Sequence, residues 1–267
     1  MKKVIVISGC SSGLGKYIAE KLESKGNKIF AGIRDEEAIK ELSKIWKKEG
    51  KDITPIKLDV TNDEVCQKAV KKILQHGKRI DVVINNAASV LVGPASEQTS
   101  QNFLDILNTN TVGAFRLTKY VLPSMKEQKG GKIINITSLN GILALPNFAM
   151  YCSSKFALEA LGLAWRYEVA RDNIWITSLA PGAIMNPDEH KKKKMPHKPA
   201  REKFFILKLL MPFLTYEKIT NKIESIINQS NPPAEVIMGA DAFITSNLQR
   251  FLPRNIWDRL VLYVWNK

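Results

Sequence analysis

Short apolar runs alternate with segments of helical periodicity along most of the chain, and this alternation limits the fold more than any other feature. The runs are rich in β-branched residues, as strands are, and apolar residues spaced three or four apart follow most of them. We expect strands at residues 4–7, 29–33, 56–60, 81–85, 132–137, 174–179 and 236–238. We therefore predict an α/β fold: a doubly wound parallel sheet of about seven strands, with helices on both faces, in one domain over residues 1–267.

The expected helices fill the intervals between these runs. They lie at 36–48, 62–76, 100–128, 149–171 and 216–227, after a first helix that ends near Gly26. The longest contains Pro123, where we expect a bend. Asn108, Asn110 and Thr111 lie in its middle, and polar residues there indicate a role inside the protein. An apolar stripe at helical spacing near the C-terminus predicts core or a subunit contact; its members are Ile256, Trp257, Leu260, Val261 and Val264.

Composition narrows the class of protein. With 45% hydrophobic and 25% charged residues, the chain is typical of a globular protein, and no apolar run approaches the roughly 20 residues that span a bilayer. Cys10, Cys66 and Cys152 are widely spaced, without a C-x-x-C pair. We therefore expect reduced thiols, a cytoplasmic location and no metal site. Cys10 stands before a helix and is either a thiol of lowered pKa or a small buried residue.

The net charge of +14 is spread along the helices except at one dense cluster, Lys191–Lys194. No base-stacking or groove-reading motif accompanies it, so we do not expect a nucleic-acid partner. An apolar run at 204–214 follows the cluster. Two interpretations remain open: residues 188–215 form a loop and lid over a substrate pocket, or residues 191–214 make a peripheral membrane contact. Residues 216–267 belong to the same domain.

A glycine-rich loop follows the first apolar run. It reads Ser8-Gly9-Cys10-Ser11-Ser12-Gly13-Leu14-Gly15, and a helical pattern comes next. Glycines let the backbone turn tightly and approach a pyrophosphate, whose charge the helix N-terminus favours. Strand, glycine loop and helix in this order predict a Rossmann-type dinucleotide site.

Two residues after the second strand bear on which dinucleotide binds. Arg34 follows Ile33, at the place where such folds meet the adenosine ribose, and a guanidinium suits a 2′-phosphate. A register shift of two would put the carboxylate of Asp35 there instead. We favour NADP(H), with NAD(H) as the alternative.

Tyr151 and Lys155 are four residues apart in a segment of helical spacing, so they project from one face. An ammonium beside a phenol favours the phenolate and lowers its pKa from about 10 toward neutral pH. Ser138 ends a preceding apolar run, where α/β sheets place ligands. The alternative is an ordinary exposed helix pair.

In this order, the motifs resemble those of the short-chain dehydrogenase/reductase family over essentially the whole chain. The family's T-G-x-x-x-G-x-G loop matches 8–15, with Ser8 for threonine, and its N-N-A-G turn matches 85–88, with Ala88 for glycine. Its P-G turn matches 181–182, and Asn186 stands for a later threonine. The resemblance implies a catalytic set of Asn110, Ser138, Tyr151 and Lys155. It implies cofactor contacts by Gly9, Ser11, Ser12, Gly13, Leu14, Gly15, Arg34, Asp59, Val60, Asn86, Tyr151, Lys155, Pro181, Gly182 and Ile184.

The resemblance also implies a reaction. Tyr151 would exchange a proton with a carbonyl or alcohol oxygen that Ser138 holds, while Lys155 binds the nicotinamide ribose and Asn110 holds a water that links Lys155 to solvent. The apolar run at 204–214 favours an apolar substrate: a lipid, a steroid- or retinoid-like alcohol, or an acyl compound. Members usually form homodimers or homotetramers. The alternative function is a catalytically silent protein that binds or senses the nucleotide.

Overall fold

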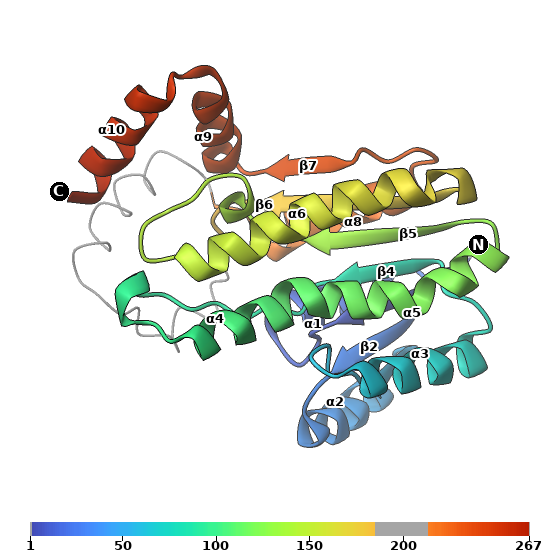
Figure 1. Ribbon diagram of the computed structural model, residues 1–267. Coiled ribbons are helices and arrows are strands. Elements are labelled where there is room, and N and C mark those ends of the chain that lie inside the picture. Colours follow the sequence, from blue (N-terminus) through green and yellow to red (C-terminus); the bar gives the residue numbers. More distant parts are fainter. Residues whose placement is uncertain (1, 185–212, 267) are drawn as a thin grey trace.

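The computed structural model describes residues 2–184 and 213–266, which build one sheet of seven parallel strands (Figure 1). The strands are β1 (Val4–Ser8), β2 (Lys28–Ile33), β3 (Ile53–Lys57), β4 (Val82–Asn85), β5 (Gly131–Ile136), β6 (Ile174–Pro181) and β7 (Glu235–Met238). Their order in the sheet is β3-β2-β1-β4-β5-β6-β7, so the chain reverses its winding between β1 and β4. This is where a doubly wound sheet opens a crevice at the carboxyl ends of its strands.

Helices cover both faces of the sheet. They are α1 (Gly13–Glu23), α2 (Glu36–Lys48), α3 (Asp63–Gly77), α4 (Ser100–Leu107), α5 (Gly113–Glu127), α6 (Ala149–Val169), α8 (Tyr216–Asn228), α9 (Ala240–Phe251) and α10 (Arg254–Asn266). In Figure 1, α3, α5 and α6 lie in front of the sheet and α1, α2 and α8 behind it. The predicted fold class is confirmed.

Two hydrophobic cores follow from the alternation of side chains along each strand. In β1, Ile5 and Ile7 point to the core under α1, α2 and α8, whereas Val4 and Val6 point to the core under α3 and α5. Because both faces are covered, the central strands are apolar at almost every position, which is why they appear in the sequence as continuous apolar runs.

The third strand begins and ends earlier than we predicted. We expected residues 56–60, but β3 is Ile53–Lys57. The strand includes Pro55, because β3 is an edge strand, where a residue without an N–H is tolerated. The chain leaves the sheet at Asp59, whose carboxylate accepts hydrogen bonds from the Thr61 N–H (3.0 Å) and hydroxyl (2.7 Å).

The long helix predicted at 100–128 is interrupted, but not at Pro123. A π-helical turn at Asn108–Val112 separates α4 from α5, and α5 continues through Pro123. Asn110 is buried within the turn, so the polar residues in mid-run do have a reason to be inside. Such turns are frequent at functional sites.

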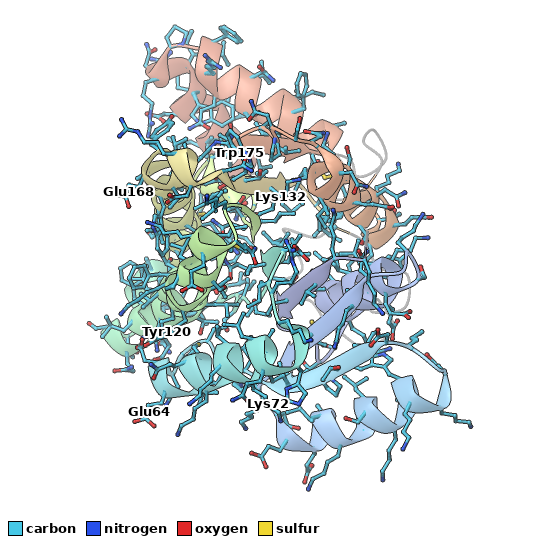
Figure 2. The ribbon with its side chains drawn as sticks, turned by 90° about the vertical axis from the view of Figure 1, so that its right-hand side faces the viewer. Glu64, Lys72, Tyr120, Lys132, Glu168 and Trp175 are labelled. Atoms are coloured by element: carbon cyan, nitrogen blue, oxygen red, sulfur yellow. The ribbon has the colours of Figure 1, made fainter. Side chains whose placement is uncertain are left out.

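The C-terminal region completes the sheet. β7 closes one side of the sheet by pairing with β6. At the edge formed by the amino ends of the strands, the Lys132 ammonium of β5 donates to the carbonyls of Ile227 (2.6 Å) and Gln229 (2.5 Å), at the end of α8. Figure 2 views this edge, with Lys132 and Trp175 near the amino ends of their strands. The predicted stripe lies on α10, where Ile256 and Leu260 are exposed.

None of the helices in the described ranges is long and apolar enough to cross a membrane. The predicted lid at 188–215, the predicted membrane segment at 191–214 and Asn186 lie outside the described residues, apart from residues 213–215.

Candidate active site

The glycine loop has the shape that a phosphate cradle requires. Gly9 and Gly13 have φ of +73° and +60°, a backbone conformation that L side chains rarely adopt. A Cβ on Gly15 would overlap the carbonyl oxygen of Gly9 and come within 2.5 Å of the Asn86 amide nitrogen. The loop therefore closes directly on the N-terminus of α1, as the fit of a pyrophosphate demands.

Ser8 and Asn86 fasten this loop to the end of β4. The Ser8 hydroxyl accepts hydrogen bonds from the N–H groups of Asn86 and Ala87 (3.0 Å each), and the Asn86 amide donates to the carbonyls of Ser8 (2.9 Å) and Gly9 (3.1 Å). The backbone at Ala88 has no positive φ, so alanine fits where the family pattern has glycine. Both departures from the motif are thus compatible with its geometry.

A polar cleft of about 320 Å³ lies between the glycine loop and the ends of β2, β3 and β4. Nine of the predicted cofactor residues line it: Gly9, Ser11, Ser12, Leu14, Gly15, Arg34, Asp59, Val60 and Asn86. Leu58, Thr61, Ala87, Ala88, Ser89 and Thr109 line it too and were not predicted. Gly13, Tyr151, Lys155, Pro181, Gly182 and Ile184 are not part of this lining.

The structure distinguishes between the two residues that follow β2. The Asp35 carboxylate accepts a hydrogen bond from the N–H of Ala38 (2.8 Å) and caps α2, whereas Arg34 lines the cleft. The side chain that faces the cleft is therefore cationic. This arrangement suits an extra phosphate better than it suits two ribose hydroxyls.

Asp59 lines the cleft just beyond the end of β3. Burial acts to raise the pKa of Asp59, but the hydrogen bonds from Thr61 and the positive charges of Arg34 and Lys57 outweigh it and hold this pKa below its ordinary value. Asp59 is therefore an acceptor at neutral pH.

Tyr151 lies in the first turn of α6. Figure 1 shows that α6 begins on the side of the sheet where the strands end. Burial raises the pKa of Tyr151, and a hydrogen bond from Ser138 lowers it only in part. The predicted lowering of this pKa is therefore wrong for the protein as it stands, because removal of water from the phenol outweighs the stabilisation of the phenolate. The Ser138 hydroxyl also accepts from the Asn140 N–H (3.1 Å), which fixes the turn that follows β5.

Lys155 is a buried cation and not half of an exposed helix pair. Its side chain is 2% exposed, and its ammonium donates to the carbonyl of Ile136 (2.8 Å) and lies 5.7 Å from the ring centroid of Tyr151. Burial lowers the pKa of Lys155 to about 8, and the negative charge of Glu159 opposes this shift. Lys155 therefore changes charge close to physiological pH.

Asn110 connects the π-helical turn to this group. Its amide donates to the Ser89 carbonyl and the Ser154 hydroxyl (2.9 Å each), and its carbonyl accepts from the Ser89 N–H (2.7 Å). The Ser154 hydroxyl donates in turn to the backbone carbonyl of Tyr151 (2.7 Å). Sequence reasoning missed Ser89 and Ser154, because nothing in their spacing marks them.

The end of β6 is held by a residue that was also missed. Asp241, in the first turn of α9, accepts a hydrogen bond from the Ala183 N–H (2.6 Å), and a Cβ on Gly182 would overlap its carboxylate. Gly182 itself donates to the carbonyl of Met238 (2.8 Å). This bond between α9 and the segment after Pro181 joins residues 58 positions apart, so local pattern does not reveal it.

Cys10 does not have a lowered pKa. It is fully buried, its thiol lies 3.3 Å from the Ile7 carbonyl, and burial raises the pKa of Cys10 far above its ordinary value. The other interpretation, a small buried residue that packs well, is the correct one.

A polar crevice at the winding reversal, together with a hydrogen-bonded serine and tyrosine and a buried lysine, defines the class of protein: an oxidoreductase that uses a dinucleotide. The family model for short chain dehydrogenases matches residues 3–197. The chain therefore belongs to the short-chain dehydrogenase family, and the resemblance seen in the sequence is confirmed.

The chain is also similar in sequence and in structure to individual known proteins. The chain is 32% identical to the 3-oxoacyl-[acyl-carrier-protein] reductase FabG of Thermotoga maritima over 75% of this chain and 80% of that protein. It is 34% identical to the 3-ketodihydrosphingosine reductase of Bacteroides thetaiotaomicron over 67% of this chain and 63% of that protein. The solved structure of ElxO with NADP bound superimposes with a TM-score of 0.78 at 26% identity, and the match covers 89% of this chain and 96% of that one.

Proposed function

We propose that this protein is an NADP(H)-dependent reductase of carbonyl groups on apolar substrates. The observation that carries the proposal is the arrangement of Ser138, Tyr151 and Lys155: a hydrogen-bonded serine and phenol, with a buried ammonium near the phenol ring. Asn110 links this group to the polar cleft, because it bonds both Ser89, which lines the cleft, and Ser154. The cationic lining at Arg34 and the solved structure of ElxO with NADP bound support NADP(H) over NAD(H).

Each of the four candidate catalytic residues has a distinct role in this proposal. NADPH, when bound, supplies the hydride. Tyr151 donates a proton to the carbonyl oxygen, and Ser138 donates a hydrogen bond that holds the same oxygen in place. Lys155 stabilises the phenolate left on Tyr151 and binds the nicotinamide ribose. Asn110 holds the turn over Ser89 and places a water that returns the proton to Lys155.

The proposed substrate is a ketone on an apolar chain. The two reductases named above act on an oxo or a keto group, by their names, and the apolar sequence at 204–214 suits the rest of such a molecule. An acyl thioester or a long-chain ketone fits both observations. The alcohol oxidation that reverses this reaction uses the same residues.

The test is oxidation of NADPH and NADH in the presence of a panel of aldehydes, ketones and acyl thioesters. We expect Tyr151→Phe to bind NADPH with unchanged affinity and to lose at least about 1,000-fold in turnover, because the proton donor is gone. Tyr120→Phe is the matched control: it removes a phenol that donates to Asp63 (3.1 Å), between α5 and α3, and should retain full activity (Figure 2).

A catalytically silent nucleotide-binding protein gives the opposite result. The wild type would then bind NADPH, detected by fluorescence, yet consume none with any member of the panel. Near-normal turnover by Tyr151→Phe would contradict the role of the phenol while leaving the cofactor assignment in place.

A further inference from the structure

Glu159 lies on α6 one turn after Lys155, and its carboxyl group is inside the protein. The hydroxyls of Thr137 and Ser178 face it, but the Thr137 hydroxyl already donates to the carbonyl of Leu179 (2.9 Å). Oε1 of Glu159 is buried without a hydrogen-bond partner in the described part of the chain. A buried carboxyl group with an unmatched oxygen is costly and calls for a functional reason.

The turn that carries Ser138 holds Glu159 in this position. A Cβ on Gly141 would lie 3.1 Å from the carbonyl oxygen of Lys155 and 3.2 Å from Cγ of Glu159. The turn at Leu139–Gly141 therefore packs onto α6 between these two residues, and the absence of a side chain on Gly141 makes room for the Glu159 stem. The carboxyl group therefore lies between α6, the turn after β5, and β6, where Thr137 and Ser178 face it.

Lys155 needs a negative charge that no direct ion pair supplies. Among the described residues, its ammonium bonds the neutral carbonyl of Ile136 and has no carboxylate within ion-pair distance. A buried ammonium in that position tends to lose its proton. Residues four apart on a helix have Cβ atoms about 5–6 Å apart, so the Glu159 charge acts on Lys155 through a poorly screened interior.

We propose that Glu159 is a positioning residue that keeps Lys155 in its ammonium form and so sets the upper pH limit of the reaction. The proposal deepens the proposed function and rests on it for its kinetic consequence. Loss of the negative charge makes both the ammonium and the neutral phenol of Tyr151 easier to deprotonate. The protonated forms of Lys155 and Tyr151, which are active in reduction, are then lost at a lower pH than in the wild type.

The charged and titratable groups around Glu159 come from two elements. On α6, Lys155 acts to lower the pKa of Glu159; Tyr151 and Cys152 both lie about two turns before Glu159 on the same helix. From β7, Glu235 acts to raise it, but Glu235 is exposed. Burial is the largest influence and raises the pKa of Glu159, so its support of Lys155 fades in acid as the carboxylate takes up a proton.

The direct test is an NMR titration of the protein labelled with ¹³Cε-lysine, with the Lys155 signal assigned by its absence in Lys155→Arg. In Glu159→Gln, we expect the Lys155 titration midpoint to fall by about one pH unit. Glu159→Asp should keep most of the wild-type midpoint. Glu235→Gln is the matched control, because it removes an exposed charge from the same surroundings, and it should leave the midpoint within a few tenths of a unit.

The kinetic test follows the NADPH-dependent reduction rate with pH. We expect the alkaline limb to move to lower pH by about one unit in Glu159→Gln, and to stay in place in Glu159→Asp and Glu235→Gln. An unshifted Lys155 titration in folded Glu159→Gln would overturn the proposal, as would an equal loss of rate at every pH. A wild type without reductase activity would contradict the proposed function alone, because the titration requires no substrate.

Discussion

Lys155 is the residue at which stability and chemistry oppose each other. Its ammonium is buried against a neutral carbonyl, so folding disfavours the charge that the proposed reaction needs. Burial lowers the pKa of Lys155 from its ordinary value of 10.5 to about 8, so the charged form is less favourable in the folded protein than in the unfolded chain. Proteins accept such local costs where function requires them.

Replacement of Lys155 should therefore stabilise the protein. We expect Lys155→Met to raise the free energy of unfolding at pH 7 by about 1–3 kcal/mol, since each unit of lowered pKa corresponds to about 1.4 kcal/mol, and to abolish turnover. The unfolded chain binds more protons than the folded one between pH 8 and 10.5, so wild-type stability recovers as pH rises through this range. The difference between variant and wild type should be full below pH 8 and shrink above it.

Urea unfolding at several pH values measures that difference. Lys72→Met is the control, because Lys72 is exposed on α3 (Figure 2) and is not part of the cleft lining. Equal stability changes in the two variants would show that the gain comes from added apolar surface and not from removal of a buried charge.

Replacement of Arg34, again a change of one residue, tests the cofactor assignment. A guanidinium–phosphate contact contributes about 1.5–3 kcal/mol, so Arg34→Leu should raise the KM for NADPH at least about 10-fold while the KM for NADH changes little. Steady-state kinetics with both cofactors measure this. Lys40→Leu, which removes an exposed charge from α2, should affect neither constant; a parallel rise for both cofactors in Arg34→Leu would contradict recognition of the 2′-phosphate.

At the scale of elements, the π-helical turn at Asn108–Val112 joins the cleft to α6. The side chain of Asn110 accepts a hydrogen bond from the N–H of Ser89 and donates one to its carbonyl. Thr111 adds a hydrogen bond from its hydroxyl to the carbonyl of Ser154 (2.8 Å). The side chains of the turn therefore join the segment at Ser89, after β4, to α6 at Ser154.

Asn110→Leu should destabilise the protein by about 2–4 kcal/mol, because it leaves several polar groups without partners, and it should also lower turnover. Thr111→Val removes one hydrogen bond and should cost about 1 kcal/mol. Thermal unfolding of both variants gives the comparison. If the two variants melt at the same temperature, the network around Ser89 does not hold the turn together.

At the scale of the whole molecule, the outer face of α6 is a candidate subunit contact. Phe156, Leu163 and Tyr167 are exposed and spaced seven and four residues apart, so they share one face of the helix. The family resemblance implies homodimers or homotetramers, so we expect this stripe to contact a second copy of the chain. We expect Leu163→Lys combined with Tyr167→Lys to yield monomers in sedimentation velocity, whereas the wild type sediments as an oligomer.

Two exposed apolar residues of α9 provide the control for that prediction. Ile244→Lys with Phe251→Lys changes an equally apolar surface elsewhere and should leave the oligomer intact. Monomers from this second variant and not from the first would place the contact on α9.

The sequence was sufficient for those parts of the molecule that obey a local rule. Buried parallel strands are continuous apolar runs, and the helix expected at 62–76 begins where its first residue, Asn62, accepts from the Val65 N–H (3.0 Å) and caps α3. Gly9 and Gly15 were identifiable because a phosphate loop has no room for other side chains. The order of such motifs along the chain was enough to indicate the family.

The parts that escaped prediction depend on contacts between distant segments. The β3 boundary follows from the edge position of Pro55, and the hold on Ala183 comes from Asp241 in α9, a helix that we did not predict. The direction of the Tyr151 pKa shift depends on burial, which no spacing reveals. Nothing in the sequence distinguishes Glu159 from other charged helix residues; only the structure shows that its carboxyl group is buried, one turn after Lys155.

A π-helical turn holds one more residue than an α-helical turn, so deletion of one residue between α4 and α5 would close it to an ordinary α-helical turn and leave both helices in register. Leu117 and Val121 would keep their places in the interior, but Asn110 would be drawn away from Ser89 and Ser154. We therefore expect a chain shortened here to keep its fold and to lose the hydrogen bonds that tie the loop after β4 to α6.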